Sequence, residues 1–377
     1  MKTYGNIRHR LLLALALGAT AASCGRASDD PTPPQQEGVE VGFRISLDDP
    51  AGTRAASQSR AGYDNGTSVD FENYIDLANK NYRILFFDMQ EHYLTTFVPE
   101  KLVPVDADPF RSKTYEVLGK IERPLPSSFK VVMLANWDAY PGPLIYGETS
   151  IADIRTAETG RYVYTVPFRL SEQRLIPMYG VKTCEHRIFT PGMRTDLGTI
   201  HLLRAMAKVE VVCTTEAWTL DEVTLHRYNG TGYCAPKDTY RSPEGDPELY
   251  YTDEVHLVGD ANDAEVKSLS LEQPQPGRFV AYIPEYRNLA AGSGNRKAAD
   301  AAELRVRFKE RSDKEYTIEF KYYNNPPAEN KVDDPFDIRR NSYYKFTITK
   351  AEEQKLVVDV AWYESRPLDP GFGLLPE

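Results

Sequence analysis

The chain has 377 residues, of which 27% are charged, and its 55 Asp and Glu against 45 Lys and Arg give a formal net charge of −10. An acidic surface repels phosphate groups, so this charge argues against a nucleic acid or an anionic lipid as partner. The length is sufficient for two domains of ordinary size, so stability need not depend on disulfide bonds.

The N-terminus has the pattern of a bacterial export signal. Lys2, Arg8 and Arg10 precede an uncharged apolar run, which is shorter than the roughly 20 residues that a membrane-spanning helix needs. Small residues then lead to Cys24, as in a signal peptide that is cleaved. We therefore predict a signal peptide over residues 1–23.

The Cys at this cleavage point resembles the lipobox of bacterial lipoproteins. The resemblance implies that the Cys24 thiol carries acyl chains, palmitate among them, and anchors the protein in the outer membrane at the cell surface. Several chains give stable anchoring where one alone is marginal. Residues 24–38 are rich in Pro, Asp, Ser and Gln, and we predict a disordered tether there. The alternative is an ordinary signal peptide that happens to end near a Cys.

The first segment after the tether alternates with a period of two. Val39, Val41, Phe43, Ile45 and Leu47 are apolar, and the residues between them are polar or Gly. This alternation predicts a strand with one buried and one solvated face. A cluster rich in Asp, Pro and Gly follows, and it should end the strand.

Similar patterns continue along the chain. The unbroken apolar runs 84–87 and 131–135 predict strands buried on both faces. Residues 150–157 predict a short helix with Ser150 as its N-cap. The clearest hairpin joins 304–308 to 316–322 through a polar turn at 310–314. The other segments that alternate are 162–168, 207–213, 344–348 and 356–362.

Many short strands and almost no helical pattern predict the fold class. We expect an all-β protein with little helix, made of two antiparallel β-sandwich-like domains. The boundary is placed near residue 200, which gives an N-terminal domain over 39–199 and a C-terminal domain over 200–377.

No motif for catalysis, a metal or a cofactor is recognisable. Nucleophile-elbow, zinc-protease and phosphate-loop patterns are missing from the sequence, so we predict no enzyme and no cofactor. Cys184 and His186 offer two zinc ligands where a closed site needs four, and a packed Cys beside a partly exposed His is favoured. The acidic segment 260–265 lacks the ligand spacing of a calcium loop, which favours a solvated loop.

Three Cys remain after the lipobox, namely Cys184, Cys213 and Cys234. An odd number cannot form a complete disulfide framework. The sequence does not decide whether two of the three form one disulfide bond.

Six segments, spread over most of the mature chain, together resemble the fimbrillins, which are the subunits of type V pili in Bacteroidales bacteria. The segments are 131–137 (VVMLANW), 176–180 (IPMYG), 202–211 (LLRAMAKVEV), 282–285 (YIPE), 338–348 (IRRNSYYKFTI) and 356–362 (LVVDVAW). Their order, together with the lipobox, is more specific than any one of them.

The resemblance implies two transthyretin-like domains, export as a lipoprotein and assembly by strand exchange. In that family a protease cuts after an Arg and removes the first strand, and a C-terminal strand of a neighbouring subunit enters the vacated groove. The plug would here be the strand Val39 to Leu47, and the cut would follow Arg54, with Arg60 as second candidate. Partners would be other fimbrial subunits and a ligand on a host or bacterial surface.

Two alternatives stay open. The first strand could be a permanent edge strand, as in a lipid-anchored basal subunit. The Pro-rich tail 366–377 is a poor strand former, so the chain could be a tip or anchor subunit that donates no strand. The 24 Tyr and 3 Trp could instead line the groove of a stand-alone glycan-binding lipoprotein, although such aromatics more often fill sandwich cores.

Overall fold

The computed structural model places the strands and the core, and it describes residues 38–47, 71–105, 107, 112–155, 163–236, 267–290, 296–323, 333–351 and 356–364. The predicted acylation site Cys24, the processing candidates Arg54 and Arg60, the acidic segment 260–265 and the tail 366–377 lie outside the described residues.

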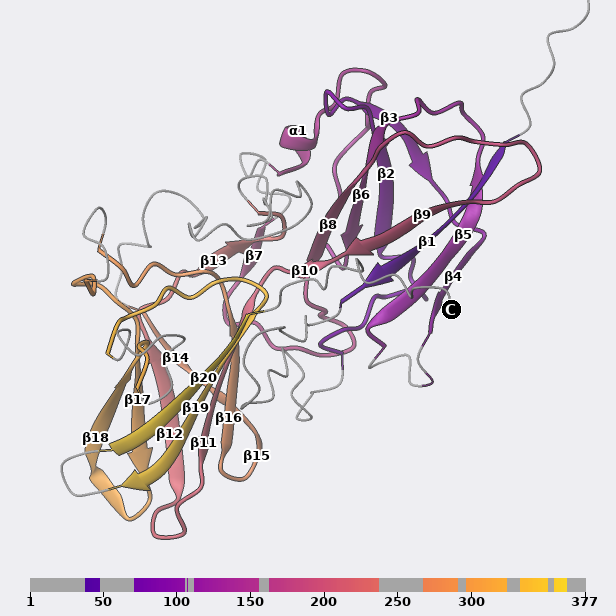
Figure 1. Ribbon diagram of the computed structural model, residues 1–377. Coiled ribbons are helices and arrows are strands. Elements are labelled where there is room, and N and C mark those ends of the chain that lie inside the picture. The colour runs from indigo at the N-terminus through magenta and orange to yellow at the C-terminus, as the bar shows by residue number, and fades with distance from the viewer. Residues whose placement is uncertain are drawn as a thin grey trace, which may run out of the picture. The chain divides into compact units, whose positions relative to one another are not determined.

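The regular secondary structure of the described residues consists almost entirely of β-strands, as the alternation predicted (Figure 1). The strands of the first half are β1 Val39–Ser46, β2 Tyr82–Phe87, β3 Tyr93–Phe97, β4 Lys101–Pro104, β5 Thr114–Ile121, β6 Phe129–Ala135, β7 Val163–Thr165, β8 Met178–Cys184, β9 Thr195–His201 and β10 Leu203–Arg204. Those of the second half are β11 Ala207–Cys213, β12 Leu220–His226, β13 Thr231–Tyr233, β14 Ser268–Ser270, β15 Glu272–Gln275, β16 Arg278–Ile283, β17 Glu303–Phe308, β18 Arg311–Glu319, β19 Ser342–Ala351 and β20 Leu356–Glu364.

Two sheets enclose the core of the first half. Their strand orders are β4-β5-β1-β9 and β10-β8-β6-β2-β3, and their facing side chains form one cluster that includes Phe43, Phe86, Phe129 and Met133. Two sheets that bury a common layer of alternating side chains form a β-sandwich. We call these two sheets the N-terminal sandwich.

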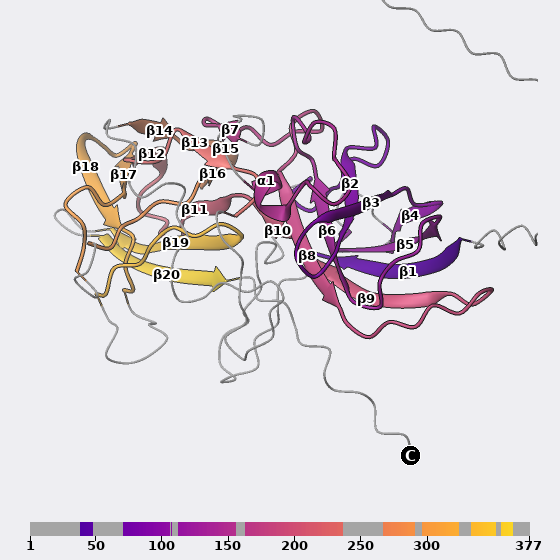
Figure 2. The ribbon, with the colours of Figure 1, turned by 90° about the horizontal axis from the view of Figure 1, so that it is seen from above.

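The second half repeats this arrangement with sheets ordered β15-β16-β11-β19-β20 and β14-β12-β17-β18, which we call the C-terminal sandwich (Figure 2). Phe308, Ile318 and Phe346 lie in its core. A third cluster, around Trp137 and Tyr343, contains residues of both halves, and Glu37–Glu377 form one compact unit. The domain boundary at 199/200 stays a prediction.

Two strand pairs differ from the antiparallel pattern that we expected throughout. β1 runs parallel to β9, and β11 runs parallel to β19. Parallel neighbours need a long crossover connection instead of a hairpin. Alternation within a segment shows which face is buried but not which distant strand lies beside it, so the sequence could not reveal these pairs.

Most predicted elements are confirmed. β2 and β6 are buried on both faces, with Ile84 and Leu85 fully inaccessible. The helix α1, Ile151–Arg155, is shorter than expected, and the Ser150 hydroxyl and the Asp153 carboxylate cap it by exchanging hydrogen bonds with each other's backbone N–H. Within the described ranges no helix has both the length and the apolar character needed to cross a membrane.

Two local predictions were wrong. The hairpin turn was expected at 310–314, but Phe308 pairs with Arg311 and β18 begins there, because an exposed edge strand can be polar on both faces. The strand 207–213 was expected to have a polar face formed by Lys208 and Glu210. Both side chains are in fact fully buried. Their burial is possible because Lys208 pairs with Glu72 and Glu210 pairs with Arg278.

Gly180 in β8 lets the two sheets of the N-terminal sandwich approach closely. A Cβ there would lie 2.5 Å from the backbone oxygen of His201 at the end of β9. We expect Gly180→Ala to lower the free energy of unfolding by about 1–3 kcal/mol through overpacking. Urea denaturation measures this, and Thr183→Ala on the same strand, at a half-buried position, is the control.

Candidate functional site: the first strand and its groove

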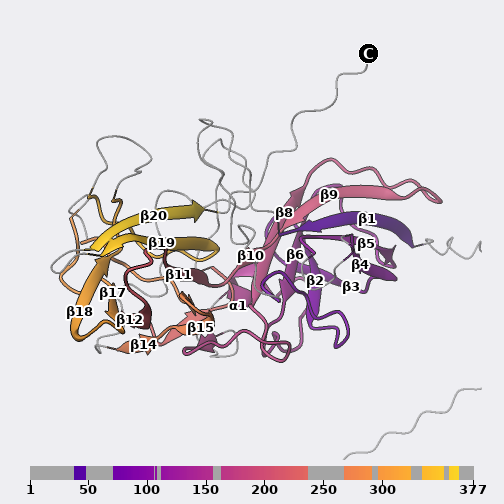
Figure 3. The same cartoon turned by 90° about the horizontal axis from the view of Figure 1, so that it is seen from below.

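β1 occupies an interior position of its sheet. It pairs antiparallel with β5 along its whole length, from Val39 opposite Ile121 to Ser46 opposite Thr114, and parallel with β9 on its other side. Figure 3 shows β1 between these two neighbours. The first strand of the described chain is therefore no edge strand, and its backbone is hydrogen-bonded on both sides.

The plug side chains point into the core of the N-terminal sandwich. Val41, Phe43, Ile45 and Leu47 are each 3% exposed or less, and Val39 packs against the same core. The Phe43 ring lies 5.9 Å from that of Phe97, centroid to centroid. Complete burial of one such side chain stabilises a fold by roughly 1.5–3 kcal/mol, so these residues contribute a large part of the core.

The opposite face of β1 is polar, as the alternation predicted. Glu40 and Arg44 are exposed, and the Glu40 carboxylate lies 3.7 Å from the Lys120 ammonium of β5. Gly42 is buried, and a Cβ there would approach Leu118 to 2.9 Å. The strand thus has one apolar face and one charged face, which fixes its register in the sheet.

The C-terminal end of β1 is held from three directions. The Leu47 N–H donates to the Lys113 carbonyl at 2.7 Å, and the Leu202 N–H donates to the Ser46 carbonyl at 2.9 Å. The Arg204 guanidinium donates through Nη2 to the Leu47 carbonyl at 3.3 Å. Leu47 is the last described residue before the segment that contains Arg54.

Loss of β1 would leave a groove between β5 and β9. The facing backbone groups of both strands would lose their partners, and the side chains that now cover Phe43 and Ile45 would be exposed. Unpaired strand edges beside an apolar floor are a template for an added strand. Such a groove would match an extended segment whose alternate side chains are apolar.

A cluster of buried polar side chains adjoins the end of β1. We call it the buried polar cluster and define it as Glu72, Asn73, Arg204, Lys208 and Asn341, all 3% exposed or less. The Lys208 ammonium lies 2.6 Å from the Glu72 carboxylate, and the Tyr282 hydroxyl donates to the same carboxylate. Burial raises the pKa of Glu72, and the charge and hydrogen bond of Lys208 oppose this effect.

Sequence reasoning missed this cluster. Its one local signal was Lys208 inside the apolar strand 207–213, and a solvated face shows the same pattern. The partners of Arg204 and Lys208 come from segments more than a hundred residues away. A second buried ion pair joins two of the segments that carried the family resemblance, since Arg340 contacts both carboxylate oxygens of Glu285 at 2.9 Å.

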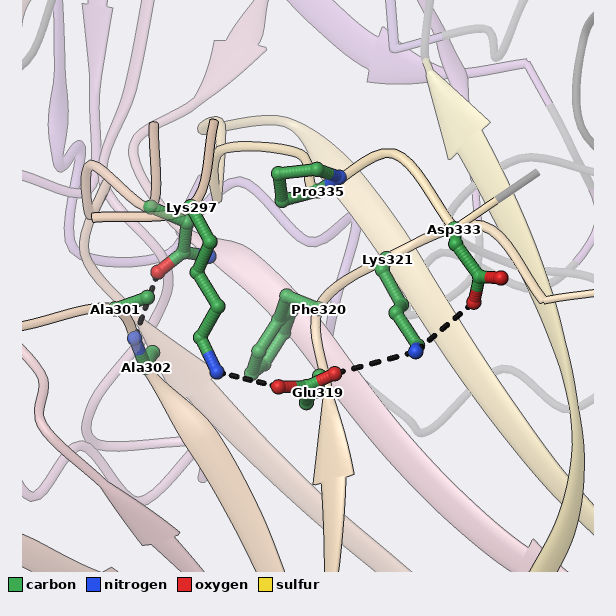
Figure 4. A pocket seen from close by; sticks show the side chains of 9 residues that line it. Lys297, Ala301, Ala302, Glu319, Phe320, Lys321, Asp333 and Pro335 are labelled. Atoms are coloured by element: carbon green, nitrogen blue, oxygen red, sulfur yellow. Dashed lines mark hydrogen bonds and ion pairs between the residues drawn. The ribbon is translucent and has the colours of Figure 1, made fainter. Parts of the chain in front are cut away.

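A pocket in the C-terminal sandwich contains charged side chains that pair with one another (Figure 4). Lys297, Glu319, Lys321 and Asp333 form a chain of ion pairs with N–O distances of 2.5, 3.2 and 2.9 Å. The pocket holds about 80 Å³, which suffices for a few water molecules. The four charged side chains are thus paired with one another. The volume of the pocket is too small for a sugar ring.

A larger hollow lies on the outer face of the sheet that contains β2 and β3. Its volume is about 240 Å³, and Arg83, Tyr93, Thr96 and Tyr140 are among the residues that line it. The Arg83 guanidinium lies 4.5 Å from the centroid of the Tyr140 ring, which stacks parallel to Trp137. The hollow offers hydroxyl groups and one cation to a polar ligand.

The Cys and His candidates agree with the favoured interpretation. Cys184 is buried, and His186 is exposed at the following turn. Cys184, Cys213 and Cys234 form no disulfide with one another. Among the described residues no group of three or more His, Cys, Asp or Glu side chains is placed to hold a metal ion.

Comparison with solved structures relates this geometry to known folds. The tip fimbrial protein Mfa3 from Porphyromonas gingivalis, solved with a C-terminal truncation, superposes with a TM-score of 0.51 at 14% identity, over 86% of this chain and 99% of that chain. The described chain and Mfa3 therefore share a fold. The all-β fold that the sequence resemblance implied is thereby confirmed.

Two further fimbrial structures are similar over nearly their whole length. Fimbrilin FimA from Porphyromonas gingivalis W83 has a TM-score of 0.45 at 9% identity over 86% of this chain and 96% of that chain. A fimbrial assembly protein from Parabacteroides distasonis has a TM-score of 0.44 at 14% identity, over 86% of this chain and 99% of that chain. Neither a protein-family model nor a curated protein matches the chain.

Proposed function

We propose that this protein is a fimbrillin-family subunit of a cell-surface fimbria, that it assembles by strand exchange, and that it has two domains and no catalytic activity. The observation that supports this most directly is the position of β1. The first described strand fills an interior groove, pairs on both sides and buries three apolar side chains, Val41, Phe43 and Ile45, and Leu47 just past its end is buried as well. A strand so placed can be replaced by a donor strand of the same pattern.

Processing after Arg54, or after Arg60, would release the lipid, the tether and β1 in one piece. We expect a trypsin-like protease to cut the purified chain in this segment and to produce ordered oligomers, visible by electron microscopy and size-exclusion chromatography. An Arg54→Gln, Arg60→Gln variant should stay uncut there and monomeric. Cut protein that yields only monomers or unfolded chain would contradict assembly by strand exchange.

The anchor is tested independently of assembly. We expect Cys24→Ala to abolish acylation and to release the protein from the outer membrane fraction into the soluble fraction, because the thiol is the only proposed attachment point. Cell fractionation with immunoblotting measures this, and Cys213→Ala is the control. Retention of Cys24→Ala on the membrane would contradict the lipoprotein proposal.

A stand-alone glycan-binding lipoprotein is the second candidate, favoured by the hollow beside β3. Its hydroxyl groups and the Arg83 guanidinium could bind sugar hydroxyls and carboxylates. We expect an Arg83→Ala, Tyr140→Ala variant to lose at least tenfold in affinity on a glycan array if this function holds. A variant in the charged pocket, Lys321→Ala, is the control. Equal binding by both variants would contradict this candidate.

A further inference from the structure

The large apolar side chains that remain exposed gather at one end of the N-terminal sandwich. Among the described residues six such side chains are more than half exposed, and four of them are Ile145, Tyr146, Ile188 and Met193. Ile188 and Met193 belong to the connection 185–194 between β8 and β9. Single exposed apolar residues are ordinary, whereas a group of them marks a surface that meets a partner or a membrane.

This end of the sandwich is the one where β1 begins. Val39 lies opposite Ile121, the last residue of β5, and β9 begins opposite Val41. The connections 122–128, after β5, and 185–194, before β9, therefore both lie at the start of β1. Figure 3 shows the second of them beyond the start of that strand. We define the tether end as these two connections together with Ile145 and Tyr146.

The parts of the tether end contact one another. The Arg187 N–H donates to the Ser127 carbonyl at 2.7 Å, which joins the two connections. The Arg123 guanidinium lies 5.9 Å from the centroid of the Tyr146 ring, so Tyr146 and its neighbour Ile145 adjoin the first connection. The exposed apolar side chains thus belong to one continuous surface.

The connection 185–194 is fixed at its base and presents two apolar side chains to the outside. The Phe189 ring stacks on that of Phe129 in the core, with 6.0 Å between the centroids. The side chain just before it, Ile188, is 83% exposed, and Met193 is 63% exposed. The packing of Phe189 explains why Ile188 cannot turn inward, because adjacent residues of an extended segment point to opposite sides.

The tether end is not acidic, although the whole chain has a net charge of −10. Its two connections contain Arg123, Arg187 and Arg194 against Glu122 and Glu185. Arg beside exposed apolar residues suits the interfacial region of a membrane, where the apolar groups enter the lipid and the guanidinium groups stay among the headgroups. The acidity of the chain therefore does not oppose a lipid contact at this end.

The predicted acylation site is close to the tether end along the chain. Cys24 precedes Gly38 by 14 residues, and a Cβ on Gly38 would lie 3.3 Å from the Ile121 carbonyl oxygen. A chain of this length spans at most about 50 Å. A short link raises the effective concentration of the two surfaces that it joins to about the millimolar range, so even a weak contact with lipid is populated once the chain is anchored.

Building on the proposed lipid anchor, we propose that the tether end is a docking surface for the membrane that holds the anchor, with Ile188, Met193 and Tyr146 in the interfacial region of the bilayer. Docking fixes the orientation of the N-terminal sandwich. β1 begins at the lipid and ends opposite the start of β5, so Leu47, from which the chain continues to Arg54, faces away from the membrane. The proposed processing segment then starts on the side that an extracellular protease reaches.

Quenching of fluorescence by brominated lipids tests the contact. The full mature chain, made without acylation, is coupled through Cys24 to a maleimide lipid in phosphatidylcholine vesicles. Cys213→Ala removes the one partly exposed thiol among the three described Cys, and the parent chain gives the background of the three native Trp. We expect lipids brominated on their acyl chains to quench Ile188→Trp at least about twice as strongly as Val98→Trp. Val98 is the matched control, since it is 75% exposed on the same sandwich but outside the tether end.

Equal quenching of Ile188→Trp and Val98→Trp would overturn the proposal. This result does not depend on acylation in the cell, because the maleimide lipid replaces the acyl chains. The lipoprotein proposal fails separately, if Cys24→Ala stays on the membrane. Docking alone does not retain that variant, because without the anchor a contact in the millimolar range is too weak.

Removal of the apolar side chains tests whether the tether end docks as a unit. With Tyr146→Trp as the reporter in the same anchored chain, Ile188→Ser combined with Met193→Ser should lower the quenching by at least about half, because less apolar surface then enters the lipid. Val98→Ser combined with Val105→Ser is the control and should leave the quenching unchanged. All four positions are exposed, so the fold tolerates the changes.

Equal quenching in the two double variants would contradict docking through Ile188 and Met193. If quenching is absent, and Ile188→Ser with Met193→Ser instead weakens the oligomers of the protease-cut chain, the tether end contacts a neighbouring subunit and the proposal is wrong.

Discussion

Phe43→Ala should lower the free energy of unfolding by about 3–5 kcal/mol, the range for loss of a buried aromatic side chain from a core. Phe43 is 3% exposed and its ring contacts that of Phe97, so the cavity would lie between the two sheets of the N-terminal sandwich. Typical domains are stable by roughly 5–15 kcal/mol, and the loss would be a large fraction of this. Urea denaturation followed by tryptophan fluorescence measures it.

Arg44→Ala on the same strand is the matched control for Phe43→Ala. Arg44 is exposed on the opposite face, and an exposed substitution should change stability by about 0.5 kcal/mol or less. Equal effects of the two substitutions would mean that β1 does not pack as described. In cut protein Phe43→Ala should also speed release of the first strand, since the strand is then held by less buried surface.

The location and the face of β1 were predictable because a period of two needs only local information. Val41, Phe43 and Ile45 alternate with polar residues and Gly, and the structure buries them. What could not be predicted is that β9 lies beside β1 in parallel. Many strands of the chain have a similar apolar face, so pairing depends on how the whole set of strands packs.

Charged groups in the core were the main failure of prediction. Lys208 and Glu210 lie on the face of β11 that the alternation predicts to be exposed to solvent, but both side chains are buried. Burial of such charges requires partners that the local sequence does not contain: Glu72 lies at 2.6 Å from Lys208, and Arg278 at 2.7 Å from Glu210. The contacts of Arg204 with Leu47, Asn73 and Asn341 are equally remote in sequence.

The second large loss of stability is expected when the ion pair of Glu72 and Lys208 is broken. Lys208→Met should destabilise the protein by about 3–5 kcal/mol at neutral pH, because the carboxylate of Glu72 would stay buried without its cation. Lys101→Met is the matched control, since its ion pair with Glu116 has the same 2.6 Å distance but is 49% and 41% exposed. Exposed pairs contribute only about 0–1 kcal/mol. Denaturant titration of both variants measures the difference.

The pH dependence of Lys208→Met distinguishes a lost ion pair from a packing defect. Burial already raises the pKa of Glu72, and the Lys208 charge and hydrogen bond lower it, so the substitution should raise this pKa further. A carboxyl whose pKa is higher in the folded than in the unfolded chain favours folding while it is protonated, and this contribution is lost as the pH rises through the folded pKa. The deficit of Lys208→Met should therefore be smaller at about pH 5 than at about pH 8, and Glu72→Gln combined with Lys208→Met should recover most of it at the higher pH. A deficit that is independent of pH would contradict the ion pair as its cause, and would indicate that Lys208 acts through its packing on the Tyr343 ring, 4.9 Å from its ammonium.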